Sequence, residues 1–365
     1  MYSLQAFDCT EISGHEGGRN RIFVFSNGDG EKFVLRVSAL GDRTEQEYLA
    51  ETEFVHYLAA EGAPVVDVVP SINGRLVECV VVEAARDARD SGNTRDVGDA
   101  GGAKGASTCD ADDAQDRDDA SNTLGSGDAD NAPVFLSLFE YARGMLLCDN
   151  GYRYRDGAPL EEYFYNTGKT LGKIHALSKR FTPSSSECRR PSYFEKYNMD
   201  YINRLIPDTS GTYTDLKNAI AARLCEFKKL PTDTESFGLV HFDYSDGNYH
   251  IDMATGDITV FDFDNCMYCW YMFDLANLRT HGEGWFRGET NATRRQDLMN
   301  WYFHTILEGY KTETTIPNEM LNQLSLFIDM VLIENIVDEF ECCAREGENV
   351  DYEDIKGAAE WLLKK

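Results

Sequence analysis

The sequence predicts an α+β protein with two lobes, a small N-terminal lobe around an antiparallel sheet and a larger, mainly helical C-terminal lobe. The 365 residues are 42% hydrophobic, which supplies two cores at roughly 150 residues per lobe. Hairpin signals dominate residues 1–140, whereas helical spacing of apolar residues dominates residues 141–365. We therefore expect the boundary between the lobes near residue 140.

Two strand hairpins are expected in the N-terminal lobe. Residues 21–26 and 32–37 are strand-like and are joined by Asn-Gly-Asp-Gly at residues 27–30, a strong turn signal. Residues 76–82 and 134–139 have strand composition as well. The simplest arrangement pairs these two as a second hairpin with a long loop in place of its turn. Loop-closure entropy grows slowly with length, so such a loop is tolerable.

The long loop itself, residues 83–132, has no aromatic residue and carries 13 acidic against 5 basic side chains. A segment of this kind buries too little apolar surface to offset its ordering entropy. We expect a disordered acidic insert. The insert accounts for −8 of the net charge of −28, so the folded remainder is acidic too.

A helix is expected between the two hairpins. Thr44 and Glu47 form a capping-box pattern, and Gly62 suits the C-terminal end. Apolar Phe54 and Leu58 lie on one side of it. This element completes the N-terminal lobe.

The C-terminal lobe is expected to be helical around one short hairpin. Residues 164–177 predict one helix, and seven apolar residues predict a core-facing stripe in another. The stripe consists of Met320, Leu324, Phe327, Ile328, Val331, Leu332 and Ile336. Residues 249–252 and 258–261 are short strand-like runs with a turn at 254–257.

The charge balance limits the partners. A net charge of −28 repels nucleic-acid backbones and anionic lipid, so neither is expected as a partner, whereas a cationic small molecule is tolerated or attracted. Acidity is equally a means of staying soluble. The sequence has no signal-peptide pattern and no apolar run of about 20 residues. Ten cysteines form no spacing framework, so we expect reduced thiols and a cytoplasmic protein.

One segment carries the chemistry. His241 and Asp243 are followed by Asn248, and Asp262 lies beyond the predicted hairpin. Phosphoryl transfer needs a carboxylate to orient or accept the proton of the attacking hydroxyl, and oxygen ligands that hold Mg²⁺ on the phosphates. A loop that supplies an Asp and an Asn, together with a hairpin that supplies a second Asp, meets these needs.

These motifs resemble the aminoglycoside phosphotransferase and choline-kinase-like superfamily, which shares the protein-kinase fold. The resemblance rests on His-x-Asp-x-x-x-x-Asn at 241–248, on Phe-Asp-Phe at 261–263 and on Tyr-x-x-Asp-Leu-Ala at 271–276. It covers nearly the whole chain except the insert. The sequence of residues 261–266 is most similar to that of the branch that holds homoserine kinases, hydroxylysine kinases and bacterial kinases related to stress-response kinases.

The resemblance implies roles for the C-terminal lobe. Asp243 corresponds to the catalytic base, and Asn248 and Asp262 to the magnesium ligands. His241 is expected to order the loop through backbone hydrogen bonds. Asp274 is expected to brace the loop or to cap the following helix. His175 lies in a Gly-x-x-Leu-Gly-x-x-His pattern and is expected to be a core histidine, not a catalyst.

The resemblance also implies a nucleotide-binding N-terminal lobe. Arg36 stands where family members often have a Lys that binds the phosphates, and an exposed strand Arg is the alternative. Its partner should be Glu51, which fits the family spacing better than Glu53.

Two further segments complete the expected nucleotide site. Gly17, Gly18 and Asn20 match a loose phosphate-covering loop, although an ordinary hairpin turn fits equally well. Residues 139–144 resemble the connector between the lobes, where backbone groups of Glu140 and Ala142 would meet the purine.

The expected activity is transfer of phosphate from ATP or GTP, with Mg²⁺, to a hydroxyl of a small molecule. A cationic amino alcohol or amino sugar would suit the charge. Two alternatives stay open: a kinase-shaped regulatory module without turnover, and a protein Ser/Thr kinase of the stress-response type. Acidic candidates for an amine contact are Glu161, Glu162, Asp264 and Glu283.

Overall fold

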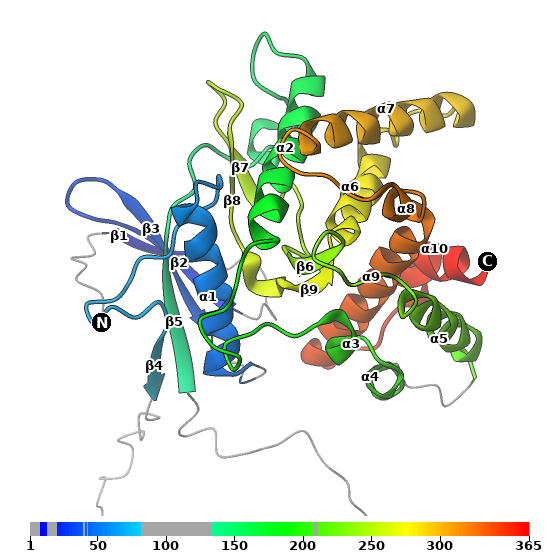
Figure 1. Ribbon diagram of the computed structural model, residues 1–365, viewed down its shortest axis with the longest axis horizontal. Coiled ribbons are helices and arrows are strands. Elements are labelled where there is room, and N and C mark those ends of the chain that lie inside the picture. Colours follow the sequence, from blue (N-terminus) through cyan, green and yellow to red (C-terminus); the bar gives the residue numbers. More distant parts are fainter. Residues whose placement is uncertain are drawn as a thin grey trace, which may run out of the picture.

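The computed structural model describes residues 8–12, 20–38, 41, 43–81, 133–206 and 211–364. The predicted insert at 83–132 and the glycines Gly17 and Gly18 lie outside these described residues. Within them, a five-stranded antiparallel sheet with one helix precedes a mainly helical part (Figure 1). The predicted fold class is therefore confirmed.

The sheet of the N-terminal lobe has the strand order β1-β2-β3-β5-β4. Its strands are β1 Asp8–Glu11, β2 Asn20–Ser26, β3 Lys32–Ser38, β4 Glu78–Val81 and β5 Pro133–Glu140. Both expected hairpin pairings form: β2 pairs antiparallel with β3, and β4 with β5. At the first turn, the Gly30 N–H donates to the Asn27 carbonyl at 3.0 Å, and Gly30 has φ +82°, which favours glycine. Strand β5, the last strand of this sheet along the chain, ends at Glu140; the lobe boundary expected near this residue stays a prediction.

Helix α1, Glu45–Ala60, starts where the capping box predicts. The Thr44 hydroxyl accepts from the Glu47 N–H, and the Glu47 carboxylate accepts from the Thr44 N–H. Its buried residues include Phe54 and Leu58, which belong to the core shared with the C-terminal lobe. The helix thus connects the small lobe to the large one.

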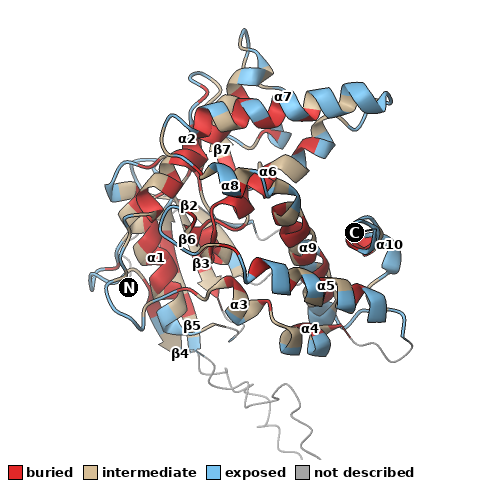
Figure 2. Cartoon of the chain, turned by 45° about the vertical axis from the view of Figure 1, so that its right-hand side comes forward, coloured by how far each residue is buried: buried red, intermediate tan, exposed pale blue. Residues whose placement is uncertain are grey.

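The second part contains nine α-helices among the described residues, α2 to α10. The long helices are α2 Leu160–Ser178, α5 Thr214–Phe227, α6 Met272–Trp285, α7 Ala292–Tyr310, α9 Leu324–Glu346 and α10 Tyr352–Leu363; the short ones are α3 Tyr193–Lys196, α4 Met199–Leu205 and α8 Asn318–Leu321. Two single-turn 3₁₀ segments, η2 Cys148–Asn150 and η3 Phe263–Asn265, complete the helical elements. The buried faces of these helices turn toward one another (Figure 2).

Helices α2 and α7 approach closely because glycine stands at their contact. A Cβ on Gly168 would lie 1.9 Å from the Ile306 carbonyl oxygen, and one on Gly309 would lie 2.0 Å from the Tyr165 carbonyl oxygen. Any side chain at these positions would push the two helices apart.

The apolar stripe predicted between residues 320 and 336 is divided between two helices. Met320 belongs to α8, and the remaining residues belong to α9. Met320, Phe327, Val331 and Ile336 are buried, whereas Leu324, Ile328 and Leu332 are half-buried. The predicted stripe therefore faces the core, and the buried face also includes Met330 and Ile333.

The second part also contains two small two-stranded sheets. The predicted runs form β7 Tyr249–Ile251 and β8 Ile258–Val260, which pair antiparallel. Strands β6 Phe237–Val240 and β9 Met267–Trp270 pair in the same manner. Each described cysteine is free. Among the described helices, none is both long and apolar enough to cross a bilayer.

Candidate active site

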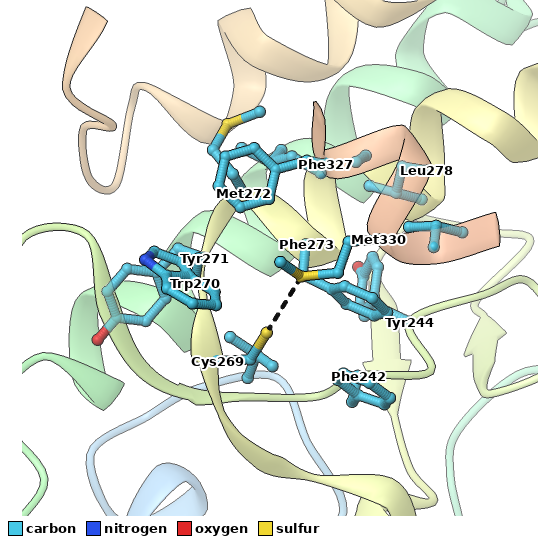
Figure 3. Packing of buried hydrophobic residues seen from close by; sticks show 14 of the residues in the cluster. Phe242, Tyr244, Cys269, Trp270, Tyr271, Met272, Phe273, Leu278, Phe327 and Met330 are labelled. Carbon is cyan, nitrogen blue, oxygen red and sulfur yellow. Dashed lines mark hydrogen bonds between the residues drawn. The ribbon is translucent and has the colours of Figure 1, made fainter. Parts of the chain in front are cut away.

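The loop from β6 to β7 holds Asp243 in an unusual backbone conformation. Phe242 has φ +72°, a left-handed value that costs energy in a residue with a side chain. Its ring stacks on Phe273 at 4.1 Å between centroids, inside the cluster drawn in Figure 3. The packing of Phe242 therefore helps to hold the turn that presents Asp243.

Asp274 of α6 accepts hydrogen bonds from the backbone of this turn. Its carboxylate accepts from the His241 N–H at 3.0 Å and from the Phe242 N–H at 2.9 Å. Its third partner is His175 Nε2 at 3.1 Å, whose Nδ1 lies 3.0 Å from the Tyr310 hydroxyl. Burial lowers the pKa of His175, so the neutral ring donates to Asp274 and accepts from Tyr310. The contacts of Asp274 are those of a loop brace; it caps no helix.

His241 connects the turn to the segment that follows the hairpin of β7 and β8. Its Nδ1 accepts from the Asp243 N–H at 3.3 Å, which leaves Nε2 to donate to the Phe261 carbonyl at 3.0 Å. One imidazole therefore fixes the backbone at Asp243 and the residue before Asp262. Both contacts are to backbone groups, as the sequence analysis expects.

Asp243 is half-buried, and its surroundings favour the protonated form. Burial raises the pKa of Asp243, and nearby His241 and Asn248 oppose the shift. The Asn248 amide nitrogen donates to the Asp243 carbonyl at 2.8 Å. The amide oxygen of Asn248 therefore faces away from that bond and is available as a ligand.

Asp262 follows β8 and also has a left-handed conformation, with φ +61°. Loss of hydration on burial and repulsion from Asp264 raise the pKa of Asp262 to about 7, while Arg36 opposes the shift. The side chain nevertheless has an exposed surface. Because water reaches the Asp262 side chain, we attribute its raised pKa mainly to repulsion among the carboxylates. A cation placed here would remove that repulsion.

Arg36 of β3 forms a buried, two-bond ion pair with Glu51 of α1. The distances are 2.7 Å from Nη1 to Oε1 and 2.8 Å from Nη2 to Oε2, and Arg36 is 4% exposed. Burial disfavours the charged guanidinium, but Glu51 and Asp264 hold the pKa of Arg36 above its ordinary value. Glu53 instead contacts Ser184. The spacing argument for Glu51 therefore identifies the contact that forms.

The Nε–H of Arg36 is buried and has no hydrogen-bond partner among the described residues. Such orphaned donors are rare and call for an explanation. A phosphate oxygen placed beside β3 would accept from it. The phosphate-binding role expected for Arg36 is consistent with this unpaired donor and stays a prediction.

Three of the four acidic candidates for an amine contact already have cationic partners. The Asp264 carboxylate binds Arg43 and lies 3.5 Å from Arg36. Glu162 pairs with Arg155 at 2.7 Å, and Glu283 pairs with Arg295. Glu161 is exposed, and the amine contact stays a prediction.

The acidic residues that face Asp243 lie on α9, and the sequence analysis missed them. Glu334 and Asp338 are one helical turn apart, and their charges act on Asp243 and on each other. Burial raises the pKa of Glu334 to about 8, with repulsion from Asp338 added. Acidic residues at i and i+4 beside the apolar stripe of the predicted helix were the available signal.

The connector between the lobes already uses some of its backbone groups. The Glu140 N–H donates to the Asp67 carbonyl at 2.9 Å, and His250 Nδ1 lies 3.0 Å from the Ala142 carbonyl. The expected contact of backbone groups of Glu140 and Ala142 with a purine stays a prediction. Asn20 starts β2 and accepts from the Ser38 hydroxyl at 2.6 Å, a contact between strands.

The donor set fits a hard divalent cation. Asn248 and Asp262 offer an amide and a carboxylate oxygen, ligands that Mg²⁺ and Ca²⁺ prefer. In the described chain, no three His, Cys, Asp or Glu side chains gather as a metal site. A site with two protein ligands suits Mg²⁺, which keeps several waters and binds nucleotide phosphates.

Known proteins with similar sequences and folds share this arrangement of two lobes. Amicoumacin kinase of Bacillus subtilis is 22% identical over 250 residues, which are 68% of this chain and 57% of that protein. The chain thus spans little more than half the length of this curated relative.

Two solved structures show the fold. Amicoumacin kinase hAmiN in complex with AMP-PNP, Ca²⁺ and Ami has a TM-score of 0.70 at 17% identity, over 100% of this chain and 89% of that chain. A microcompartment-associated aminopropanol kinase has a TM-score of 0.61 at 17% identity, over 99% and 91%. Both support the bilobal kinase-like fold.

The family itself follows from the match over residues 10–307 to the model described as the Phosphotransferase enzyme family. The matched range includes β2, α1, the loop with Asp243 and the hairpin that leads to Asp262. It covers most of the chain, and this protein therefore belongs to the Phosphotransferase enzyme family.

Proposed function

We propose that this protein is a small-molecule kinase that moves the γ-phosphate of ATP or GTP to a hydroxyl group. One observation carries the proposal. Arg36 and Glu51 of the N-terminal lobe lie within electrostatic reach of Asp262 and Asp264. Phosphate-binding and metal-binding groups from the two lobes thus converge on one place, as phosphoryl transfer requires.

The chain's residues take distinct roles in this proposal. Asp243 orients the acceptor hydroxyl and takes its proton, which its raised pKa favours. Asn248 and Asp262 hold Mg²⁺, which neutralises charge on the phosphates when bound. Arg36, fixed by Glu51, donates its free Nε–H to a phosphate oxygen.

For the base and the ligands of the metal, the support is geometric. The left-handed turns at Phe242 and Asp262 present their neighbouring polar groups from a braced backbone. His241 binds backbone on both sides, so the two acidic groups keep a fixed separation. Preorganised groups of this kind need little rearrangement when substrate arrives.

A cationic acceptor fits the C-terminal side of the site. Glu334 and Asp338 act electrostatically on Asp243, and an ammonium group between them would relieve the repulsion. The relative named for aminopropanol supports testing amino alcohols first. We therefore propose an amino alcohol or amino sugar as the acceptor class.

Two measurements test the proposal. A thermal-shift series with ATP or GTP, with and without Mg²⁺, should raise Tm when both are present. Phosphate transfer should then be measured on amino alcohols, amino sugars, neutral sugars and casein. Transfer to neutral sugars alone would reject the cationic acceptor. Transfer to casein alone would indicate a protein kinase, and nucleotide binding without any transfer would indicate a regulatory module.

A further inference from the structure

A buried arginine outside the motifs lies behind the candidate metal site. Arg190 stands between α2 and α3 and is only 2% exposed. Its guanidinium donates to three backbone carbonyls: Nε to Cys266 at 2.7 Å, Nη2 to Asp264 at 2.8 Å and Nη1 to Glu47 at 3.3 Å. A buried cation held by carbonyls alone is uncommon, since buried charges usually have a charged partner.

The three carbonyls belong to two parts of the candidate site. Asp264 and Cys266 lie in and just after the 3₁₀ turn η3, which follows Asp262 directly. Glu47 lies in the first turn of α1, one helical turn before Glu51. One planar guanidinium thus joins the loop of a metal ligand to the helix that holds Arg36.

The same turn is also held from the N-terminal lobe. The Asp264 carboxylate binds Arg43 and lies 3.5 Å from Arg36. Asp264 is therefore fixed by its backbone through Arg190 and by its side chain through the other two arginines. The left-handed Asp262 needs such support, because strained backbone persists only where its surroundings determine it.

We propose that Arg190 is a positioning residue that keeps Asp262 and Glu51 at a fixed separation before nucleotide binds. This rests on the proposed function for the roles of those two residues. The lobes of the site are then assembled in the free protein, and no separate activation step is needed to dock α1. Arg190 acts through the backbone of η3 and touches neither substrate nor metal.

Arg190→Lys tests this role, because lysine keeps the charge but donates from a single nitrogen, which cannot reach three carbonyls that are bound by three different nitrogens of the guanidinium. The matched control is Arg189→Lys, since the neighbouring Arg189 pairs with the partly exposed Glu195. Hydrogen exchange is measured in the nucleotide-free proteins. In Arg190→Lys we expect faster exchange in residues 45–51 and 262–267 together, with α7 unchanged.

A second readout is the Mg²⁺ concentration that gives half-maximal binding of ATP. It should rise roughly tenfold in Arg190→Lys, as is typical when a group behind a metal ligand is lost, while ATP binding without metal stays the same. The control should match wild type in both readouts. An unchanged Mg²⁺ requirement, or exchange that rises uniformly through the protein, would overturn the proposal.

Wild type provides the test if the variant does not fold. Under low denaturant, residues 45–51 and 262–267 should open as one unit with the same denaturant dependence. Independent opening would overturn the proposal. If wild type bound neither ATP nor GTP, the proposed function would be rejected instead, and the exchange result would still decide whether Arg190 couples the two segments.

Discussion

The two halves of the candidate site hold their carboxylates in opposite ways. In the N-terminal half, arginines neutralise the carboxylates that they contact: Arg36 pairs with buried Glu51, and Arg43 binds Asp264 of the C-terminal lobe. In the C-terminal half, Asp243 and Asp262 face other carboxylates, and their pKa values are raised. The same chemical group is neutralised in one place and left in excess in the other.

This difference separates structure from chemistry. A paired, buried carboxylate fixes geometry, because its position is determined by its partner. Carboxylates that repel one another raise the free energy of the empty site, and a bound cation relieves this repulsion. The N-terminal half is therefore suited to orient groups, and the C-terminal half to receive cations, which the proposed function takes to be a metal ion and a cationic acceptor.

The largest effect is expected from a substitution in the C-terminal half, at Asp243. Asp243→Ala should lower phosphate transfer by about 10³-fold, the usual contribution of a positioned base, because no other group takes the hydroxyl proton. Steady-state transfer and circular dichroism measure activity and fold. A variant that keeps full activity would show that Asp243 is not the base.

The paired half is tested by Arg36→Met. The substitution leaves Glu51 buried without its partner, which should lower the free energy of unfolding by about 3–5 kcal/mol. Denaturant unfolding measures this. In Arg36→Met with Glu51→Leu, stability should recover, whereas nucleotide binding should not. If the double variant binds nucleotide normally, Arg36 does not contact the phosphates.

The excess charge at Asp262 predicts a dependence on pH. Its folded pKa of about 7 lies above the unfolded value, so the folded protein binds more protons between about pH 4 and 7, and stability falls as pH rises through that range. Asp262→Asn removes the penalty. Without metal, its Tm should exceed that of wild type by about 2 °C at pH 8 and by less at pH 5.

Exposed Asp297 of α7 supplies the control, since Asp297→Asn should show no such trend. In wild type, the affinity for Mg²⁺ with ATP should rise between pH 5.5 and 7.5 as the Asp262 carboxylate forms. If the Tm difference from wild type did not change with pH for either Asp262→Asn or Asp297→Asn, Asp262 would carry no excess charge.

The smallest effect is expected at Glu334. Above pH 8, where Glu334 is ionised, Glu334→Gln should raise KM for an amino alcohol about fivefold, roughly 1 kcal/mol, because an ammonium group loses one attractive charge. KM for a neutral hydroxyl acceptor should not change. Glu346→Gln, at the exposed end of the same helix, is the control. Equal effects on both acceptors would exclude direct recognition of the amine.

Local patterns predicted much of this site. The capping box placed α1, the Asn-Gly turn placed β2 and β3, and family spacing favoured Glu51 over Glu53. These features depend on residues close in sequence or on a motif. The roles assigned to Asp243, Asn248 and Asp262 stay predictions until they are tested.

Long-range pairings could not be predicted. Arg43 lies 221 positions before Asp264, and nothing in either segment indicates that they meet. Arg190 has no motif, because its partners are backbone carbonyls that any residue provides. Glu334 lies about ninety residues beyond Asp243, and only the packing of α9 brings their charges together.

The brace at Asp274 has a consequence for synthesis of the chain. The turn at Phe242 has its two N–H groups bound by a residue 32 positions later, and the chain of contacts continues through His175 to Tyr310. A nascent chain that stops before Asp274 leaves those amides without acceptors. The loop should therefore take its final form only late in translation, and hydrogen exchange at Phe242 in a released fragment would measure it.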